Sequence, residues 1–380
     1  MASTGWGDGT PPSNGVFDRL RALLSTTRGR VIASVAAVVV LMAGTVIGVS
    51  LTSSDEAPAA TTTTTTTTAP TTTTTVPPPP PTWPLTGQPI PDPALANKPA
   101  LVVKVDNVEP DSRPQIGINQ ADIVYEERVE GAVTRFMAVF HSTDSEPVGP
   151  VRSARTSDIG LFRPLGTPLF AWSGANPTFA ERVRGAGIVD VGYEAATDQF
   201  HRAGDRRAPH NLMLNSTAEM WAANYPGATV PGPLFTYRAA NEQVTGGTPI
   251  TGVHIVFAEG AGSAPVDYGW TGAGWARSQS GTPHVDANGA QVAPENVIIS
   301  FTPYAETDVQ DQFGVPIREA QTVGEGEAWV LTGGQLINAH WVKPALEAPT
   351  QYLDAAGQPV KLTPGRTWVA LPEPGTATVV

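Results

Sequence analysis

The residues best suited to bind a ligand lie in one short segment, Gly149-Pro150-Val151-Arg152-Ser153-Ala154-Arg155. Arg152 and Arg155 are three positions apart, so a helical conformation would place both guanidinium groups on one face. Beside the backbone N–H groups of a helix start, the two arginines would hold an anion. Ion pairing within the protein is the alternative role. Ser153 stands outside a GxSxG elbow, so the pattern does not favour a nucleophilic serine.

A second group of candidates flanks a basic turn and consists of His201, Arg202, His210 and Asn211. Histidine changes charge near neutral pH, which suits general acid–base chemistry. The two histidines are nine positions apart, which fits neither HExxH nor a zinc-finger spacing, and we therefore predict no metal site. The phosphate-loop pattern GxxxxGK[ST] is absent as well, and no cofactor is expected. In the alternative interpretation these side chains pin down a long loop.

Carboxylates form a third group of candidates on the predicted strands. Glu126 shares a strand face with Arg128 and Glu130, and Arg135 lies on the following strand. A line of ionisable groups there would suit the acid and base roles of glycan hydrolysis. Ordinary surface charge on an edge strand is the alternative.

Arginine is unevenly distributed along the chain, which has 19 arginines and 4 lysines. Beyond residue 51, 11 of the 15 arginines fall between Arg113 and Arg207. Guanidinium groups match the geometry of carboxylates and phosphates, so this window predicts recognition of an anionic group, with Arg113 among the candidates. The same window holds 12 Asp and Glu residues, and pairing within the protein accounts for part of the pattern.

These candidates depend on a predicted framework of strands and short helices. Residues 83–240 combine apolar or alternating runs with capped helical segments, whereas residues 241–380 contain short runs separated by Gly, Pro and Asn, typical of antiparallel sheet. Ser216 with Glu219 has the spacing of a capping box, and Asn176 precedes a helix that starts with proline. Predicted strands are 101–106, 122–128, 134–141, 169–172, 253–257, 274–279, 296–303, 327–331, 335–343 and 367–371, and predicted helices are 156–162, 177–184 and 217–224.

The strongest local signal is the run Val31–Leu51, which is long enough to cross about 30 Å of hydrocarbon as a helix and contains no charge. Arginines precede it and acidic residues follow it, so the positive-inside rule predicts a single-pass cell-membrane anchor with residues 1–30 in the cytoplasm and the rest outside. A cleaved signal peptide is the alternative. Residues 52–82, rich in Thr and Pro, are predicted to form a disordered linker, a composition shared with O-glycosylated stalks.

Composition excludes several classes of protein. The chain has no cysteine, which excludes disulfides, thiolate metal sites and a lipid anchor. Its net charge of −12 argues against nucleic-acid binding, which requires a basic face. The predicted partners are therefore the membrane and an anionic cell-wall component or an envelope protein.

Several motifs together resemble the YerB-like family of bacterial lipoproteins, a two-part domain of unknown function (DUF3048). The resemblance covers roughly residues 83–372 and implies an extracytoplasmic cell-envelope setting, without supplying a reaction or site residues. The family's lipid-bearing cysteine has no counterpart here, and the predicted transmembrane anchor takes its place. The motifs are Trp83–Gly87, Leu101–Asp106, Arg113–Gly117, Ala121–Glu126, Thr134–Phe136, Gly149–Arg155, Arg207–Asn211, Phe301–Tyr304, Thr332–Gln335, Trp341–Pro344 and Leu362–Trp368.

Taken together, the sequence predicts an α+β protein whose N-terminal part (83–240) is mixed α/β and whose C-terminal part (241–380) is mostly antiparallel β. A transmembrane helix (31–51) and a disordered linker precede them. The predicted function is a membrane-anchored extracytoplasmic binding or scaffold module that recognises an anionic ligand through its arginine-rich N-terminal domain. The alternative is an envelope hydrolase that acts on glycan or phosphodiester bonds, with Glu126, His201 or His210 as acid–base groups.

Overall fold

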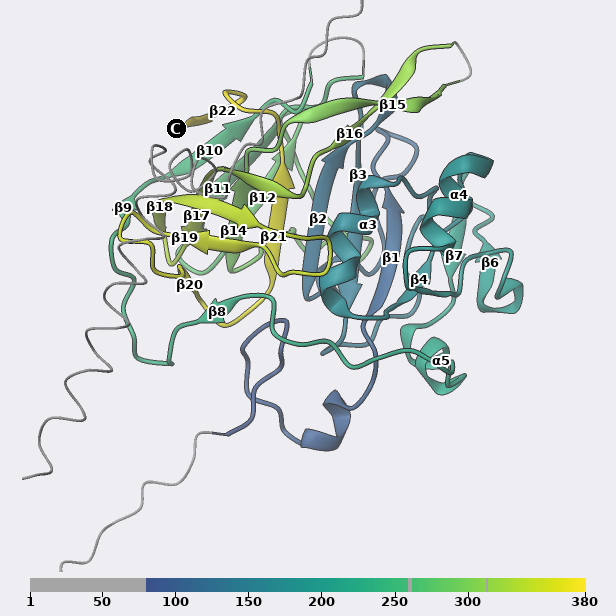
Figure 1. Cartoon of the computed structure of the whole chain (residues 1–380), viewed down its shortest axis with the longest axis horizontal. Coiled ribbons are helices and arrows are strands. Elements are labelled where there is room, and N and C mark those ends of the chain that lie inside the picture. Colours follow the sequence, from purple (N-terminus) through teal and green to yellow (C-terminus); the bar gives the residue numbers. More distant parts are fainter. Residues whose placement is uncertain (1–79, 259–261, 312–313) are drawn as a thin grey trace, which may run out of the picture. The chain divides into compact units, whose positions relative to one another are not determined.

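The computed structural model describes residues 80–258, 262–311 and 314–380, which form a mixed α/β structure with many strands and few helices (Figure 1). The predicted cytoplasmic tail, transmembrane helix and nearly all of the predicted linker lie outside these residues. Within the described ranges, no helix is both long enough and apolar enough to span a bilayer.

An 11-stranded mixed sheet forms the centre of the structure, in the order β19-β18-β17-β14-β21-β2-β3-β1-β4-β5, with β9 paired to β18. Its strands are β1 (Leu101–Asp106), β2 (Ile123–Arg128), β3 (Thr134–Phe140), β4 (Leu169–Ala171), β5 (Val189–Asp190), β9 (Thr248–Pro249), β14 (Asn296–Ser300), β17 (Gly324–Thr332), β18 (Gln335–Lys343), β19 (Gln351–Leu353) and β21 (Thr367–Leu371). The central strands β1, β3, β14 and β21 are buried along their whole length, because both faces of the sheet are covered.

A second, five-stranded antiparallel sheet lies over one face and runs β13-β12-β11-β10-β22. Between the two sheets is an apolar core to which Val105, Phe136 and Trp368 contribute from the large sheet and Tyr268 and Trp275 from the small one. The strands of the small sheet are β10 (Gly252–Ile255), β11 (Val266–Trp270), β12 (Trp275–Gln279), β13 (Thr282–Pro283) and β22 (Ala377–Val379).

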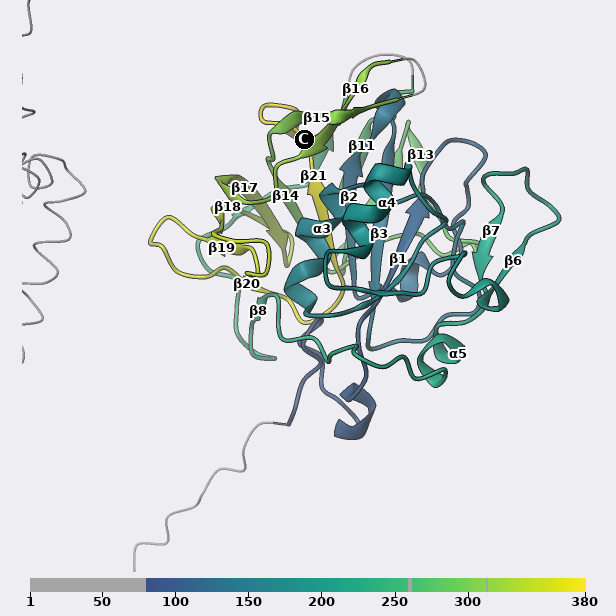
Figure 2. The same cartoon turned by 45° about the vertical axis from the view of Figure 1, so that its right-hand side comes forward.

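Short helices cover the opposite face. Figures 1 and 2 both show α3 (Ser157–Phe162) and α4 (Pro177–Arg184) lying on the β1–β3 part of the sheet, where Leu161 and Val183 join a second apolar core. α5 (Thr217–Ala222) lies to one side. Three two-stranded ladders complete the fold: β6 (Phe200–Arg202) with β7 (Leu212–Leu214), β8 (Thr236–Tyr237) with β20 (Lys361–Leu362), and β15 (Tyr304–Gln310) with β16 (Pro316–Ala320).

Strand β21 joins the two parts of the chain in one sheet. It runs parallel to β14 on one side and parallel to β2 on the other, and Figure 1 shows this late, yellow strand beside the early, blue one. Strands from before and after residue 240 therefore belong to one large sheet. The domain boundary predicted at residue 240 stays a prediction, and it does not divide this sheet.

Most predicted elements are confirmed, several to the residue, among them β1, β18 and β21. The predicted caps form as well: the Asn176 side chain accepts a hydrogen bond from the Thr178 N–H, and the Ser216 hydroxyl accepts one from the Glu219 N–H. The conformation considered for Arg152–Arg155 is not found, because these residues are non-helical and precede α3. The backbone N–H of Arg152 instead donates to the Lys104 carbonyl at the edge of β1.

Candidate functional site

A buried carboxylate, Asp106, marks the end of β1 and organises the most reactive group of side chains. The Nδ1 atom of His210 lies 2.5 Å from Asp106 Oδ2, and the Nε atom of Arg152 lies 3.2 Å from the same oxygen. The other oxygen accepts the Asn107 N–H at 3.0 Å. An ionised carboxylate only accepts hydrogen bonds, so the proton of His210 is on Nδ1, and Nε2 has no partner among the described residues.

Arg135 lies beside Asp106, because the register of β1 and β3 pairs the two residues. Its Nη1 donates to the Ser153 carbonyl at 2.9 Å, whereas its buried Nε has no hydrogen-bond partner in the described part of the chain. Burial, together with the nearby charges of Arg155 and Arg152, lowers the pKa of Arg135 to about 9. The nearby carboxylates of Asp106 and Glu130 act in the opposite direction, and the group stays protonated at neutral pH.

Arg155 is held in place by Glu130. Its Nε lies 2.9 Å from Glu130 Oε1, and its Nη2 also donates to Glu130 Oε2. Burial, the largest single influence, would raise the pKa of Glu130, but the hydrogen bonds and charge of Arg155, together with the charge of Arg135, outweigh burial and lower it. The resulting fork-to-fork pair orients Arg155 next to Arg135 and Arg152.

A second buried ion group lies behind these arginines on the same sheet face. Lys104 Nζ lies 2.5 Å from Glu127 Oε1 and 2.7 Å from Asp158 Oδ1, and all three side chains are fully buried. Asp158 also accepts the Arg155 N–H at 2.8 Å, which anchors the start of α3. Burial raises the pKa of Asp158 to about 6.

We call Asp106, Glu130, Arg135, Arg152, Ser153, Arg155 and His210 the Asp106 cluster. Its central carboxylate, Asp106, is fully buried, while the side chains of Arg152, His210 and Arg155 are 21%, 14% and 12% exposed. The other carboxylate of the cluster, Glu130, is partly exposed. The cluster therefore presents mainly N–H donors to solvent and keeps its central negative charge behind them, an arrangement suited to binding an anion.

The opposite sheet face carries a different polar group around Glu126. The Glu126 carboxylate accepts hydrogen bonds from Arg277 at 2.7 Å, from the Thr134 hydroxyl at 2.8 Å and from the Trp368 indole N–H at 3.2 Å. The side chains of Glu126 and Arg277 are fully inaccessible to solvent. The five-stranded sheet covers this group, because Arg277 itself belongs to β12.

The network around Glu126 continues through His284. Arg277 Nη1 donates to His284 Nδ1 at 2.8 Å, so the ring proton is on Nε2, which donates to the Gln115 side-chain oxygen at 2.8 Å. Burial and then Arg277 hold the pKa of His284 well below its usual value, and the ring is neutral. Burial and Arg277 likewise lower the pKa of Arg113 to about 10. The Glu126 cluster comprises Asn107, Arg113, Gln115, Glu126, Thr134, Arg277, Gln279, His284 and Trp368.

The residues predicted from sequence thus fall into three places. Arg135, Arg152, Ser153, Arg155 and His210 come together in the Asp106 cluster. Arg113 and Glu126 lie in the buried Glu126 cluster, and the expected line of Glu126 with Arg135 does not form, because the register pairs Arg135 with Glu127 and puts Glu126 on the other face.

The remaining predicted residues stabilise the β6–β7 hairpin. Exposed His201 contacts the Asn215 side chain at 2.7 Å, and Arg202 donates to the Asn211 side chain at 2.7 Å. These contacts match the alternative in which the segment pins down its own loop. No group of three or more His, Asp or Glu side chains within the described ranges is placed to hold a metal ion.

Sequence reasoning did not include Asp106, Lys104 or Asp158 among the site residues. The run LVVKVD contained a usable signal, because Lys104 and Asp106 interrupt a strand that is otherwise apolar and buried on both faces. Buried charges need partners, so such a strand predicts an ion cluster on one face.

Comparisons with known proteins define the class. Residues 85–226 match the N-terminal domain and residues 253–369 the C-terminal domain of the protein family of unknown function DUF3048, and the chain belongs to this family. A relative, "Putative lipoprotein YerB" of Bacillus subtilis (strain 168), is 28% identical over 297 residues, covering 75% of this chain and 84% of YerB. The crystal structure of YerB from Bacillus subtilis superposes with a TM-score of 0.67 at 25% identity, covering 79% of this chain and 99% of that one.

Proposed function

We propose that this protein is a membrane-anchored, extracytoplasmic binding module of the cell envelope that recognises an anionic ligand through the Asp106 cluster. The printed name of the relative, "Putative lipoprotein YerB", supports an envelope setting. The apolar run Val31–Leu51 supports a transmembrane anchor with a cytoplasmic N-terminus in place of a lipid. The ligand is an anionic cell-wall component or an acidic surface of another envelope protein.

One observation carries the proposal: three arginines gather beside Asp106 and Glu130, and one of them, Arg135, is buried without a carboxylate hydrogen-bonded to it. Placing a guanidinium group in a protein interior is unfavourable unless an anion is near. Arg152 and Arg155 add N–H donors at the solvent edge. Within the cluster three guanidinium groups face two carboxylates, Asp106 and Glu130, so an oxyanion at this edge would supply a third negative charge.

The proposal is tested by titrating the full-length chain with inorganic phosphate, a glycerol-phosphate polymer of the teichoic-acid type and peptidoglycan fragments. Arg152→Gln and Arg155→Gln should each weaken binding roughly tenfold or more, because each removes charge-assisted hydrogen bonds. Arg182→Gln is the matched control, since Arg182 pairs with Asp308 on an exposed surface elsewhere. Binding that is equal in all four proteins, or absent throughout, would count against the proposal.

An envelope hydrolase is the second candidate, and the contact between His210 and Asp106 favours it. A buried carboxylate that holds Nδ1–H leaves Nε2 of His210 available as a general base, as in Asp-His pairs of hydrolases. This assigns the acid–base role to His210 instead of Glu126, which is sealed from solvent, or His201, which has no carboxylate partner in the described chain.

Turnover of glycan or phosphodiester substrates would distinguish the two functions. His210→Asn keeps a donor near Asp106 and removes the Nε2 atom, whereas His201→Asn makes the same change at the exposed hairpin. Turnover that disappears only in His210→Asn, with ligand binding retained, would favour the hydrolase. Binding without turnover in the unmodified chain would favour the binding module.

A further inference from the structure

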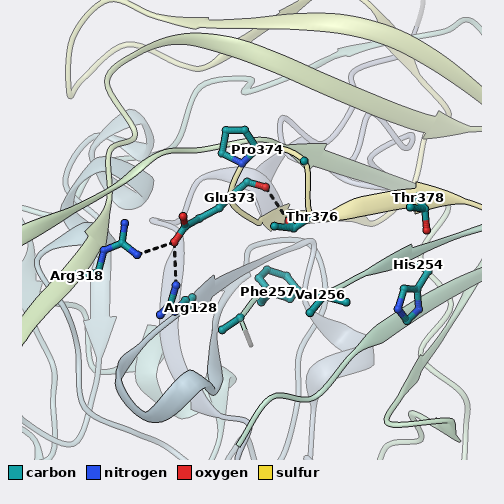
Figure 3. Close-up of a pocket in the computed structure, with 11 residues that line it drawn as sticks. Arg128, His254, Val256, Phe257, Arg318, Glu373, Pro374, Thr376 and Thr378 are labelled. Atoms are coloured by element: carbon teal, nitrogen blue, oxygen red, sulfur yellow. Dashed lines mark hydrogen bonds and ion pairs between the residues drawn. The ribbon is translucent and has the colours of Figure 1, made fainter. Parts of the chain in front are cut away.

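A separate cavity of about 480 Å³ lies at the edge of the five-stranded sheet, next to the segment that connects β21 to β22. Its size falls within the range of small-molecule sites. Figure 3 shows Arg128, Arg318 and Glu373 at one end and His254 and Thr378 at the other. None of these residues belongs to the Asp106 cluster or the Glu126 cluster.

The charged end contains two arginines and a single carboxylate. Arg128 Nη1 lies 2.8 Å and Arg318 Nη1 lies 3.0 Å from the same oxygen, Glu373 Oε1. Arg318 Nη2 also donates to the Tyr304 carbonyl at 2.9 Å. The remaining guanidinium donors have no partner among the described residues, and all three side chains are partly exposed, at 26%, 39% and 29%. The group has a net positive charge and can accept another anion.

The middle of the cavity is apolar. Val256 and Phe257 lie between its two ends in Figure 3, and Pro374 lines it from the β21–β22 connection. Hydrogen bonds from the Val256 N–H to the Thr376 carbonyl, at 2.9 Å, and from the Thr376 hydroxyl to the Glu373 carbonyl, at 2.7 Å, fix this connection. These bonds hold the β21–β22 connection beside β10.

We propose that this cavity binds a small carboxylate ligand with an apolar body. The carboxylate would pair with Arg128 and Arg318 beside or in place of Glu373. The apolar body would lie on half-buried Val256 and exposed Pro374, because Phe257 is only 3% exposed. Glu373 shows that a carboxylate fits between the two guanidinium groups. Because the bound group competes with Glu373, this residue restrains the affinity of the cavity.

Because the ligand competes with Glu373 for the two arginines, substitutions at Arg318 and at Glu373 should change the affinity in opposite directions. Isothermal titration of the full-length chain with 2-naphthoate should show saturable binding, with the neutral isostere 2-naphthamide at least roughly tenfold weaker. Arg318→Gln should weaken naphthoate binding roughly tenfold, whereas Glu373→Gln should strengthen it, since both arginines then lose their internal carboxylate. Arg182→Gln is again the matched control and should bind naphthoate like the unmodified chain.

Three results would overturn the proposal: no saturable binding of naphthoate, equal binding of naphthoate and naphthamide, or weaker binding after Glu373→Gln. Circular dichroism and thermal melting of each variant confirm that it is folded. If Arg318→Gln fails to fold, Arg128→Gln serves as the second variant with the same expectation.

Discussion

The two polar clusters lie on opposite faces of the β1–β3 part of the large sheet, and both pair arginine with carboxylate, yet they differ in access to solvent. In the Glu126 cluster, the Glu126–Arg277 pair lies under a second sheet and is fully buried. In the Asp106 cluster, a carboxylate that is equally buried supports side chains that reach the surface. The sequence places Glu126 and Glu127 side by side, and the alternation of a strand sends them to different environments.

This difference teaches that charge density alone does not identify a site in this chain. A fully buried ion pair contributes little net stability but is expensive to break, so the Glu126 cluster is best understood as a connection between the two sheets. In the Asp106 cluster a buried carboxylate orients N–H donors that reach the surface, an arrangement suited to binding an anion. Four predictions test this contrast.

The largest expected effect is on stability at the Glu126 cluster. Glu126→Ala leaves Arg277 buried without its carboxylate and should lower the free energy of unfolding by about 3–5 kcal/mol in urea denaturation. The double variant Glu126→Ala/Arg277→Met should recover much of this loss, because it removes both charges. A loss below about 1 kcal/mol in the single variant, the level of an exposed ion pair, would contradict the assignment.

The next effect concerns pH and the ion group behind the Asp106 cluster. The pKa of Asp158 is raised to about 6, so between its usual range and pH 6 the folded protein binds more protons than the unfolded chain. The contribution of Asp158 to stability therefore falls as the pH rises from about 4 to 6, and it is constant above that window.

Replacing the Asp158 carboxyl group by an amide should remove its contribution to the pH dependence of stability. The difference in unfolding free energy between Asp158→Asn and the unmodified protein should grow in favour of the variant by an amount on the order of 1–3 kcal/mol from pH 4 to pH 6. Urea denaturation at several pH values measures it. Burial also raises the pKa of Asp122 to about 6. Both proteins contain Asp122, so its contribution cancels in the difference. Parallel curves for the two proteins would contradict the prediction.

Arg135 should separate function from stability. Arg135→Gln removes a buried charge that has no carboxylate hydrogen-bonded to it, so the free energy of unfolding should change by only about 1 kcal/mol. Anion affinity should nevertheless fall roughly tenfold in the titrations described above. Loss of stability as large as that of Glu126→Ala would make Arg135 a structural residue and erase the contrast between the two faces.

The smallest effect is expected at the β6–β7 hairpin. His201→Gln changes an exposed side chain outside both clusters, so stability should stay within about 0.5 kcal/mol of the unmodified protein and anion affinity should not change. A clear loss of affinity in this variant would extend the site to the hairpin.

Local structure was largely predictable from the sequence, whereas long-range placement was not. Alternation in 101–106 and 335–343 and the caps at Asn176 and Ser216 are local signals, and the corresponding elements form as predicted. The pairing of β21 with β2 joins residues more than half the described chain apart, and no local pattern encodes it. The contact of Arg277 in β12 with Glu126 in β2 is equally long-range, and no local pattern encodes it either.

The site was predicted in part for the same reason. Arg152, Arg155 and His210 were identified by residue type, and the structure brings them together. Asp106 binds Arg152 and His210, whereas Arg155 pairs with Glu130. The position of Asp106 at the end of an apolar strand does not reveal these partners, because they come from distant parts of the chain. Arg113 was included for belonging to an arginine-rich window, although its contacts are with Asn107 and Gln279 in the buried network.

Strand β21 also imposes an order on biosynthesis. Thr367–Leu371 is synthesised after both β2 and β14, yet both strands need it as their neighbour. The nascent polypeptide therefore carries two open strand edges until β21 has been synthesised, and such edges pair readily with other chains. A premature stop codon just upstream of Thr367 would yield an aggregation-prone product instead of a smaller working module.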